Sequence, residues 1–183
     1  MTNVKNKFHQ VKINGLVRDL PIINLGAISI AYFDLMGDVE VTEAAAQALA
    51  EKLPPEAELI MTPEAKSIAL AQAMGRISGL DFIVARKTLK PTMGESLSAT
   101  VDSITTGKPQ TLHIDERSAQ KLAGKKVVLL DDVVSTGSTL EGLKVLMAEA
   151  GATVVAVMAV FSEGDQDLWE EVITLGHLPI FEN

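Results

Sequence analysis

Two adjacent acids are followed by a run of small and hydroxyl residues at a point where a strand should meet a helix. Asp131 and Asp132 come directly after an apolar strand expected over 125–130. The residues that follow lead into a helix expected over 139–150, and they are Ser135, Thr136, Gly137, Ser138 and Thr139. A helix N-terminus offers unpaired N–H groups and the positive end of a dipole, so the segment suits a phosphate. Carboxylates repel phosphate, and they therefore predict a second partner there, such as sugar hydroxyls, Mg²⁺ or its waters.

The alternative interpretation of this segment is an ordinary capped helix. Ser138 and Glu141 have the spacing of a capping box, and two acids after a strand can form a simple turn. Each feature alone favours that alternative, whereas all of them in order after an apolar strand favour a phosphate site. The sequence contains neither the G-x-x-x-x-G-K-[ST] nor the G-x-G-x-x-G motif of other phosphate sites.

Two further polar clusters follow other expected strands. The segment 64–67 (Glu-Ala-Lys-Ser) comes after a strand expected over 58–61. Arg86 and Lys87 end a strand expected over 82–85. Two neighbouring cations at a strand end suit an anion with several oxygens, such as pyrophosphate.

The chain from about Glu58 onward alternates between strand-like and helix-like segments. Apolar runs predict strands over 58–61, 82–85, 125–130 and 153–161, and helices are expected over 62–79, 139–150 and 167–175. Thr62 and Pro63 have the residue types of an N-cap and a first helical position. Alternation of this kind predicts an α/β fold with a parallel sheet covered by helices on both faces. Right-handed crossovers then bring the carboxyl ends of all strands to one edge, where such sheets bind ligands.

Two regions interrupt the alternation. Residues 96–115 contain two strands of period two around a turn over 106–109, which predicts a β-hairpin. Residues before about Thr42 contain short apolar runs without a helical period, and an Ala-rich amphipathic helix is expected over 42–53. We expect a single domain over 1–183, in which residues 1–41 form a hood over the ligand crevice of a core over 42–183.

Composition excludes several classes of protein. Hydrophobic residues make up 47% of the 183 residues, which argues against disorder. A net charge of -8 disfavours nucleic acid and anionic membrane as partners. The most apolar run, 154–161, is too short to cross a bilayer as a helix. The sequence has no cysteine, which excludes disulfides and thiolate catalysis and suits a cytoplasmic location.

The segment Val127–Thr139 resembles the 5-phosphoribosyl-1-pyrophosphate (PRPP) signature of the type I phosphoribosyltransferase family, in its purine branch. The resemblance extends from about Glu58 to the C-terminus. It implies that Asp131 and Asp132 hold the ribose hydroxyls and, indirectly, Mg²⁺. It also implies that residues 135–139 hold the 5-phosphate. The residues that it implies for pyrophosphate are Ala65, Lys66, Arg86 and Lys87. In purine-using members, Arg-Gly or Ser-Gly often stands where this chain has Lys66 and Ser67.

The family reaction joins a base nitrogen to C1 of PRPP and expels pyrophosphate. The resemblance implies Asp132 as the catalytic residue, a flap over about 90–115, and a homodimer. Val133 and Glu163 are implied beside the base, and a carboxylate there favours the exocyclic amine of adenine over an oxopurine. The hairpin sequence 97–103 also resembles xanthine phosphoribosyltransferases and the PRPP-sensing domain of a purine repressor. A xanthine- or guanine-type enzyme and a PRPP-binding regulator without transferase activity therefore remain the alternatives.

Overall fold

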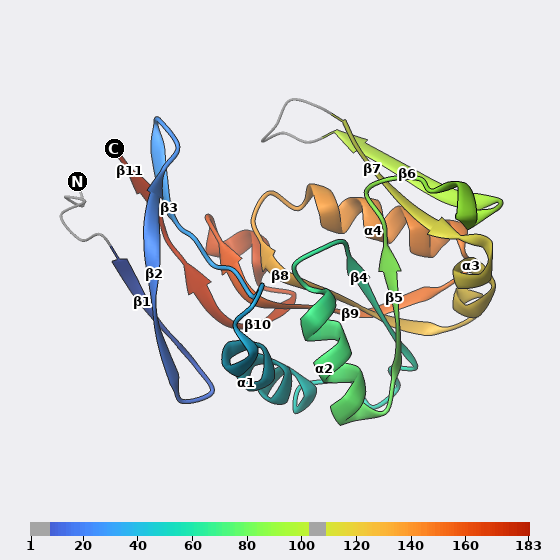
Figure 1. Ribbon diagram of the computed structural model, residues 1–183, viewed down its shortest axis with the longest axis horizontal. Helices are drawn as coiled ribbons and strands as arrows, with labels where there is room; N and C mark the ends of the chain where they lie inside the picture. The colour runs from blue at the N-terminus through green and yellow to red at the C-terminus, as the bar shows by residue number, and fades with distance from the viewer. Residues whose placement is uncertain (1–7, 103–108) are drawn as a thin grey trace.

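A parallel five-stranded sheet forms the middle of the molecule in the computed structural model, which describes residues 8–102 and 109–183. The strand order is β10-β9-β8-β4-β5, and each neighbouring pair runs parallel. The strands are β4 (Leu59–Pro63), β5 (Asp81–Ala85), β8 (Lys126–Val134), β9 (Thr153–Glu163) and β10 (Val172–Leu178). The predicted α/β fold is confirmed, and β8, which carries both acids, lies at the centre (Figure 1).

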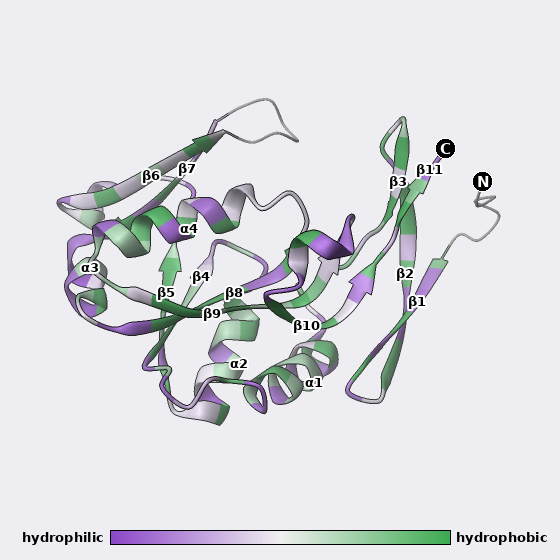
Figure 2. Cartoon of the chain, turned by 180° about the vertical axis from the view of Figure 1, so that it is seen from behind, coloured by the Kyte–Doolittle hydropathy of each residue, from purple (hydrophilic) through white to green (hydrophobic). Residues whose placement is uncertain are grey.

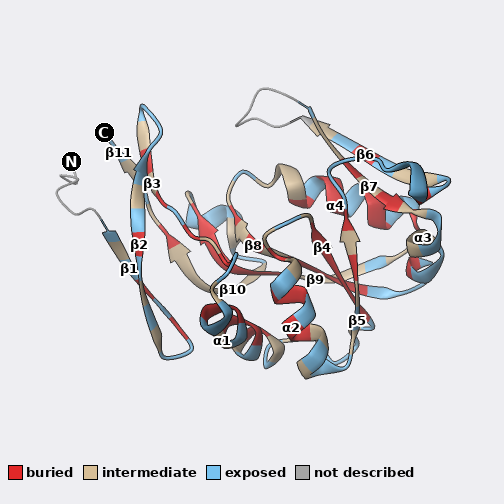
Figure 3. Ribbon diagram, in the orientation of Figure 1, coloured by how far each residue is buried: buried red, intermediate tan, exposed pale blue. Residues whose placement is uncertain are grey.

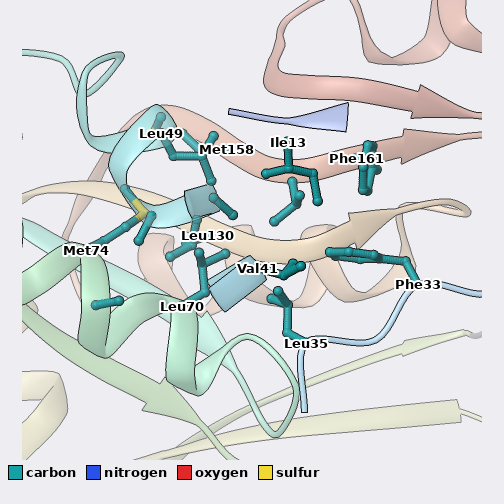
Figure 4. Close-up of a cluster of buried hydrophobic side chains, with 14 of the residues drawn as sticks. Ile13, Phe33, Leu35, Val41, Leu49, Leu70, Met74, Leu130, Met158 and Phe161 are labelled. Atoms are coloured by element: carbon teal, nitrogen blue, oxygen red, sulfur yellow. The ribbon is translucent and has the colours of Figure 1, made fainter. Parts of the chain in front are cut away.

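Helices cover both faces of this sheet because its central strands are apolar at consecutive positions, so that both faces carry apolar side chains. Val128 and Leu130 of β8 join a buried cluster with α1 (Val39–Ala50) and α2 (Ile68–Ser78). Figure 4 shows Leu130 within this cluster, among side chains of α1, α2 and β9. Val127 and Leu129 point to the opposite face, where they pack with α4 (Ser138–Glu149). Hydrophobic residues accordingly run along β8 and β9 in Figure 2, and the central strands are largely buried in Figure 3.

The predicted hairpin is confirmed, and its inner face packs on α4. It consists of β6 (Ser96–Asp102) and β7 (Pro109–Asp115), which pair antiparallel. A Cβ added at Gly142 of α4 would lie 3.1 Å from Leu112 Cδ1, so helix and hairpin approach closely. The short elements η1 (Pro91–Met93) and α3 (Glu116–Leu122) flank the hairpin. The turn expected over 106–109 lies outside the described residues except for Pro109.

The N-terminal segment forms a second sheet beside the core. Its order is β1-β2-β3-β11, all antiparallel. The strands are β1 (Phe8–Ile13), β2 (Leu16–Asn24), β3 (Ile28–Ala31) and β11 (Ile180–Glu182). The last strand comes from the C-terminus, so both ends of the chain build what we call the hood (Figure 1). Phe33, just after β3, contacts Phe161 of β9 edge-on, with ring centroids 4.8 Å apart.

Several expected element boundaries were wrong. Thr62 and Pro63 do not start a helix, because β4 continues through both and pairs them with β5; α2 begins at Ile68. The strand predicted over 125–130 continues to Val134, so both acids lie within it. The helix predicted over 42–53 begins and ends three residues earlier.

The segment expected as a helix over 167–175 contains a short 3-10 turn, η2 (Gln166–Trp169), and the strand β10. Short apolar runs do not distinguish a helix from a buried strand by periodicity alone, which explains the error. Gly176 lies inside β10, where a Cβ would sit 3.0 Å from Phe161 Cε1. No helix in the described part of the chain is long and apolar enough to cross a membrane.

Candidate active site

The two acids lie near the carboxyl end of β8 and contact the loop that follows β4. Asp131 Oδ1 accepts hydrogen bonds from Asp132 N at 2.8 Å and from Ser67 Oγ at 3.3 Å. Ser67 Oγ in turn accepts from Thr62 Oγ1 at 2.8 Å, and both hydroxyl residues are buried. This buried chain of hydroxyls fixes the orientation of the Asp131 carboxylate.

The site is short of positive charge. Burial, and next the charge of Asp132, raise the pKa of Asp131 to about 8. Lys66 Nζ lies 3.6 Å from Asp132 Oδ2, and one ammonium group cannot neutralise two carboxylates. The pair therefore suits ligands that bring hydrogen-bond donors or a cation, as ribose hydroxyls and Mg²⁺ do.

The residues present fit Mg²⁺ bound largely by its substrate. No group of three or more acidic or histidine side chains gathers to form a metal cage within residues 8–102 and 109–183. Mg²⁺ commonly uses one or two carboxylates and takes its other ligands from phosphates and water. Asp131 and Asp132 are the carboxylates that would serve here.

The segment 135–139, which is predicted to bind a phosphate and which we call the phosphate loop, leads into the N-terminus of α4. Gly137 is the N-cap residue and has φ 81°, a left-handed conformation that favours glycine. No side chain caps this end in the described structure, so the capping box proposed as an alternative is not formed. The first N–H groups of α4 therefore remain available for a phosphate.

The hydroxyl groups of this loop differ in their partners. Ser135 Oγ donates to Glu163 Oε2 at 2.8 Å, so its proton is already used. Thr136 is exposed, and its Oγ1 lies 3.4 Å from Ser138 Oγ. Thr139 is partly buried in the first turn of α4. The loop thus places four hydroxyls and a glycine together, and one of the hydroxyls is linked to β9.

The two predicted pyrophosphate segments lie side by side at the ends of β4 and β5. Glu64 N donates to Ala85 O at 2.8 Å, and Lys87 N donates to Glu64 Oε2 at 3.0 Å. The peptide bond between Glu64 and Ala65 is cis. Ala65, Arg86 and Lys87 are exposed at this edge. Three of the four predicted pyrophosphate residues are therefore exposed beside one another.

Lys66 departs from this group and turns toward the hood. Its Nζ donates to Phe33 O at 3.4 Å and lies 4.8 Å from the ring centroid of Tyr32. The sequence around the end of β4 does not predict the direction of the Lys66 side chain. That direction depends on its contact with Phe33, which lies more than thirty residues away in the chain.

A cavity of about 220 Å³ lies between the hood and the acids. Its lining comes from the hood, the loop after β4, β8 with the loop that follows it, β9 and β10: Ile30, Ala31, Tyr32, Phe33, Lys66, Asp132, Val133, Ser135, Glu163 and Leu178. Val133 and Glu163, both predicted beside the base, therefore meet in one cavity next to Asp132. At about 30 Å³ for each water, the volume corresponds to roughly seven waters and accommodates a planar bicyclic base.

The sequence did not predict three features of this site. They are the support of Asp131 by Thr62 and Ser67, the contribution of the hood to the cavity, and the position of Trp169. Trp169 Nε1 donates to Glu163 O at 3.1 Å, and its Cη2 would lie 3.0 Å from a Cβ at Gly137. The only available signal for Trp169 was that it is the one tryptophan of the chain.

A larger cavity of about 640 Å³ lies behind the phosphate loop, against Trp169, and neither Asp131 nor Asp132 lines it.

Comparisons with known proteins identify relatives of two kinds. The family model "Phosphoribosyl transferase domain" matches residues 37–171. A probable purine biosynthesis transcriptional regulator, PurR, of Streptococcus pneumoniae is 29% identical over 109 residues, which are 59% of this chain and 38% of the regulator. An adenine phosphoribosyltransferase of Clostridium botulinum is 34% identical over 124 residues, 67% of this chain and 69% of that protein.

Further matches are also phosphoribosyltransferases. Xanthine and hypoxanthine/guanine phosphoribosyltransferases are also similar to the chain. The crystal structure of adenine phosphoribosyltransferase from Thermoanaerobacter pseudethanolicus has a TM-score of 0.65 and 24% identity, covering 78% of this chain and 84% of its own. At that identity the likeness shows the fold. The chain spans about two fifths of the length of the curated regulators that it matches.

Proposed function

We propose, since this chain belongs to the phosphoribosyl transferase domain family, that it transfers ribose 5-phosphate from PRPP to a purine base and releases pyrophosphate. The observation that carries the proposal is the meeting of three features at one edge of the sheet. Two adjacent carboxylates on β8 lie beside the open N-terminus of α4 and beside a cavity suited to a base.

Each part of PRPP has a proposed place. The N-terminus of α4, with residues 135–139, binds the 5-phosphate. Asp131 and Asp132 accept hydrogen bonds from the ribose hydroxyls. Ala65, Arg86 and Lys87, with Lys66 nearby, receive the pyrophosphate. Mg²⁺ bound with PRPP would neutralise charge on the leaving pyrophosphate, and Asp131 and Asp132 would hold it through hydroxyls or waters.

The chemistry needs positioning more than a protein nucleophile. A ring nitrogen of the base supplies the electron pair that forms the new bond to C1, and the pair of the broken C1–O bond leaves with pyrophosphate. Positive charge develops at C1 in between, and the carboxylates of Asp131 and Asp132 stabilise it. Asp132, which lines the base cavity, also accepts the proton that the base gives up.

Adenine is the base that we propose. Glu163 is 8% exposed and lines the cavity, where its carboxylate would accept from an exocyclic amine and repel a carbonyl oxygen. Curated relatives named as adenine phosphoribosyltransferases support the choice. We further propose a single domain, a homodimer and a cytoplasmic location, which limited proteolysis, sedimentation and cell fractionation would test.

Release of pyrophosphate tests the proposal. Purified protein is mixed with PRPP, Mg²⁺ and, in separate reactions, adenine, hypoxanthine, guanine, xanthine, uracil or orotate. We expect the highest kcat/KM with adenine. Asp132→Asn should lower kcat by at least about 100-fold, because the carboxylate that stabilises C1 is lost. The exposed Glu56→Gln is the matched control and should leave the rate unchanged.

The second candidate is a PRPP-binding regulator without transferase activity. It is favoured by the similarity to the purine biosynthesis regulators, which covers only part of their length. Calorimetry with PRPP and Mg²⁺ separates the two candidates. Tight binding of PRPP, with no pyrophosphate released from it in the presence of any of the six bases, would favour the regulator over the enzyme.

A further inference from the structure

Lys66 is directed into the base cavity rather than toward the exposed pyrophosphate segments. Its Nζ is 3.6 Å from Asp132 Oδ2 and 3.4 Å from Phe33 O, and the residue lines the cavity of about 220 Å³. Arg86 and Lys87, by contrast, are exposed and lie outside that lining. The three cations predicted for one anion are therefore divided between two places.

The base cavity consequently carries charges of opposite sign. Glu163 on β9 offers acceptors only, and the ammonium group of Lys66 offers donors only. A purine whose edge has both an N–H group and a carbonyl oxygen can pair with both side chains. In a 6-oxopurine, N1–H can donate to Glu163 while the 6-oxo group accepts from Lys66.

Lys66 has a donor available for this contact. An ammonium group has three N–H donors; Phe33 O accepts from one of them, and Asp132 Oδ2 is an ion-pair partner at 3.6 Å. The remaining partner in the described structure is the ring face of Tyr32, 4.8 Å away. A carbonyl oxygen accepts a charge-assisted hydrogen bond, which is stronger than the attraction of an exposed ring for a cation.

We propose that Lys66 is a base-specificity residue that donates to the 6-oxo group of a purine, so that the site accepts 6-oxopurines alongside adenine. The inference rests on the proposed function in one respect, namely that the base binds in the cavity beside Asp132. It assigns to the loop after β4 a role in selecting the base, in addition to its place beside pyrophosphate. Removing the ammonium group should make the site more selective for adenine.

Equilibrium binding of AMP and IMP tests this inference without any turnover. The two nucleotides differ at the 6-position of the base, and neither contains pyrophosphate. We expect Lys66→Met to weaken IMP binding by about 10- to 100-fold, the loss of one charged hydrogen bond, and AMP binding by much less. Lys66→Arg should restore IMP binding, since a donor is retained. Lys52→Met, far from the cavity, is the matched control and should change neither affinity.

Other outcomes would overturn the inference. An unchanged ratio of the IMP and AMP dissociation constants in Lys66→Met means that Lys66 does not contact the base. Absence of IMP binding to the unmodified protein does the same. The far-ultraviolet circular dichroism of each variant checks that it is folded. Failure of the proposed function appears separately, as absence of pyrophosphate release while the two nucleotides still bind.

Discussion

At the scale of single residues, Asp131 is held in an environment that disfavours its charge. Burial and the neighbouring carboxylate raise its pKa to about 8, while the hydrogen bonds from Asp132 N and Ser67 oppose the rise only in part. The folded protein therefore binds a proton more tightly than the unfolded chain, whose Asp pKa is about 3.9. This contribution to stability is fully present below about pH 4 and is lost as the pH rises toward about 8.

Asp131→Asn should stabilise the protein above about pH 8 and have little effect near pH 4. The amide keeps an oxygen that can accept from Ser67 and Asp132 N, and it carries no charge. We expect the free energy of unfolding to rise at the higher pH, with a gain that grows between about pH 4 and about pH 8. Urea unfolding of both proteins across this range measures the difference. A gain that does not vary with pH would contradict the electrostatic explanation, and Glu56→Gln serves as the control.

Gly137 meets two demands that no other residue type meets together. Its φ of 81° favours glycine, and a Cβ there would lie 3.0 Å from the indole of Trp169. Gly151 provides a matched comparison, because its φ is 69° and a Cβ there would meet no atom within 4 Å.

Gly137→Ala should cost more than Gly151→Ala and should also weaken PRPP binding. We expect about 1 kcal/mol for the backbone conformation alone at Gly151, and about 2–3 kcal/mol at Gly137, where the indole must also move. Thermal unfolding and PRPP calorimetry measure the two effects. Equal destabilisation by the two substitutions would show that the contact with Trp169 adds nothing.

At the scale of elements, an ion-pair cluster links the hood to the core beside their shared apolar packing. Arg18 of β2 contacts Asp38, the N-cap of α1, with Nε 3.0 Å from Oδ2, and also Glu40. The hydrogen bond from Arg18, followed by the one from Val41 N, lowers the pKa of Asp38. Because β3 and the residues after it line the cavity proposed for the base, the position of the hood should determine how well a base binds.

Arg18→Met should raise the KM for the base by up to about tenfold and leave the PRPP affinity nearly unchanged. The pair is exposed, so the difference between variant and unmodified protein should shrink at high salt. Steady-state kinetics at low and high salt give both values. Arg76 of α2 forms an exposed ion pair with Glu43 of α1. Arg76→Met removes this pair and should not change the KM for the base. An equal rise in the KM for the base in both variants would mean that the effect comes from a general loss of stability and not from a shift of the hood.

At the scale of the whole molecule, the two ends of the chain complete the hood together. β11 pairs with β3, Ser29 Oγ donates to Asn183 Oδ1 at 2.6 Å, and Asn183 Nδ2 donates to Gly26 O at 2.7 Å. Figure 1 shows β11 beside β3 near the C-terminus. Removing the final strand would leave β3 as an unpaired edge of the hood.

A chain that ends at Pro179 should unfold at lower urea concentration and bind the base more weakly. We expect a loss of about 2 kcal/mol from the backbone pairing and partly buried Phe181, and about 1 kcal/mol for Asn183→Ala alone. Urea unfolding and the KM for the base measure the two consequences. Unchanged base binding in the truncated chain would show that the hood acts without β11.

The sequence by itself determined the features that depend on neighbouring residues. The apolar run of β8, the two acids and the start of α4 lie within fifteen residues, so the strand, the helix and the loop between them could be predicted together. The parallel sheet followed from the alternation of apolar strands and helices. The extent of β8 and the identity of β10 were missed, since a strand and a helix of that length have similar apolar patterns.

Only the tertiary structure decided which distant groups meet. Ser67 and Asp131 are 64 positions apart, Lys66 and Phe33 are 33 apart, and Ser29 and Asn183 are 154 apart. Such contacts leave no periodic trace in the sequence, because they arise from how the sheets pack and not from local backbone preference. The direction of Lys66, the support of Asp131 and the pairing of β11 with β3 are consequently properties of the fold, while the residues proposed to bind phosphate and ribose are neighbours in the sequence.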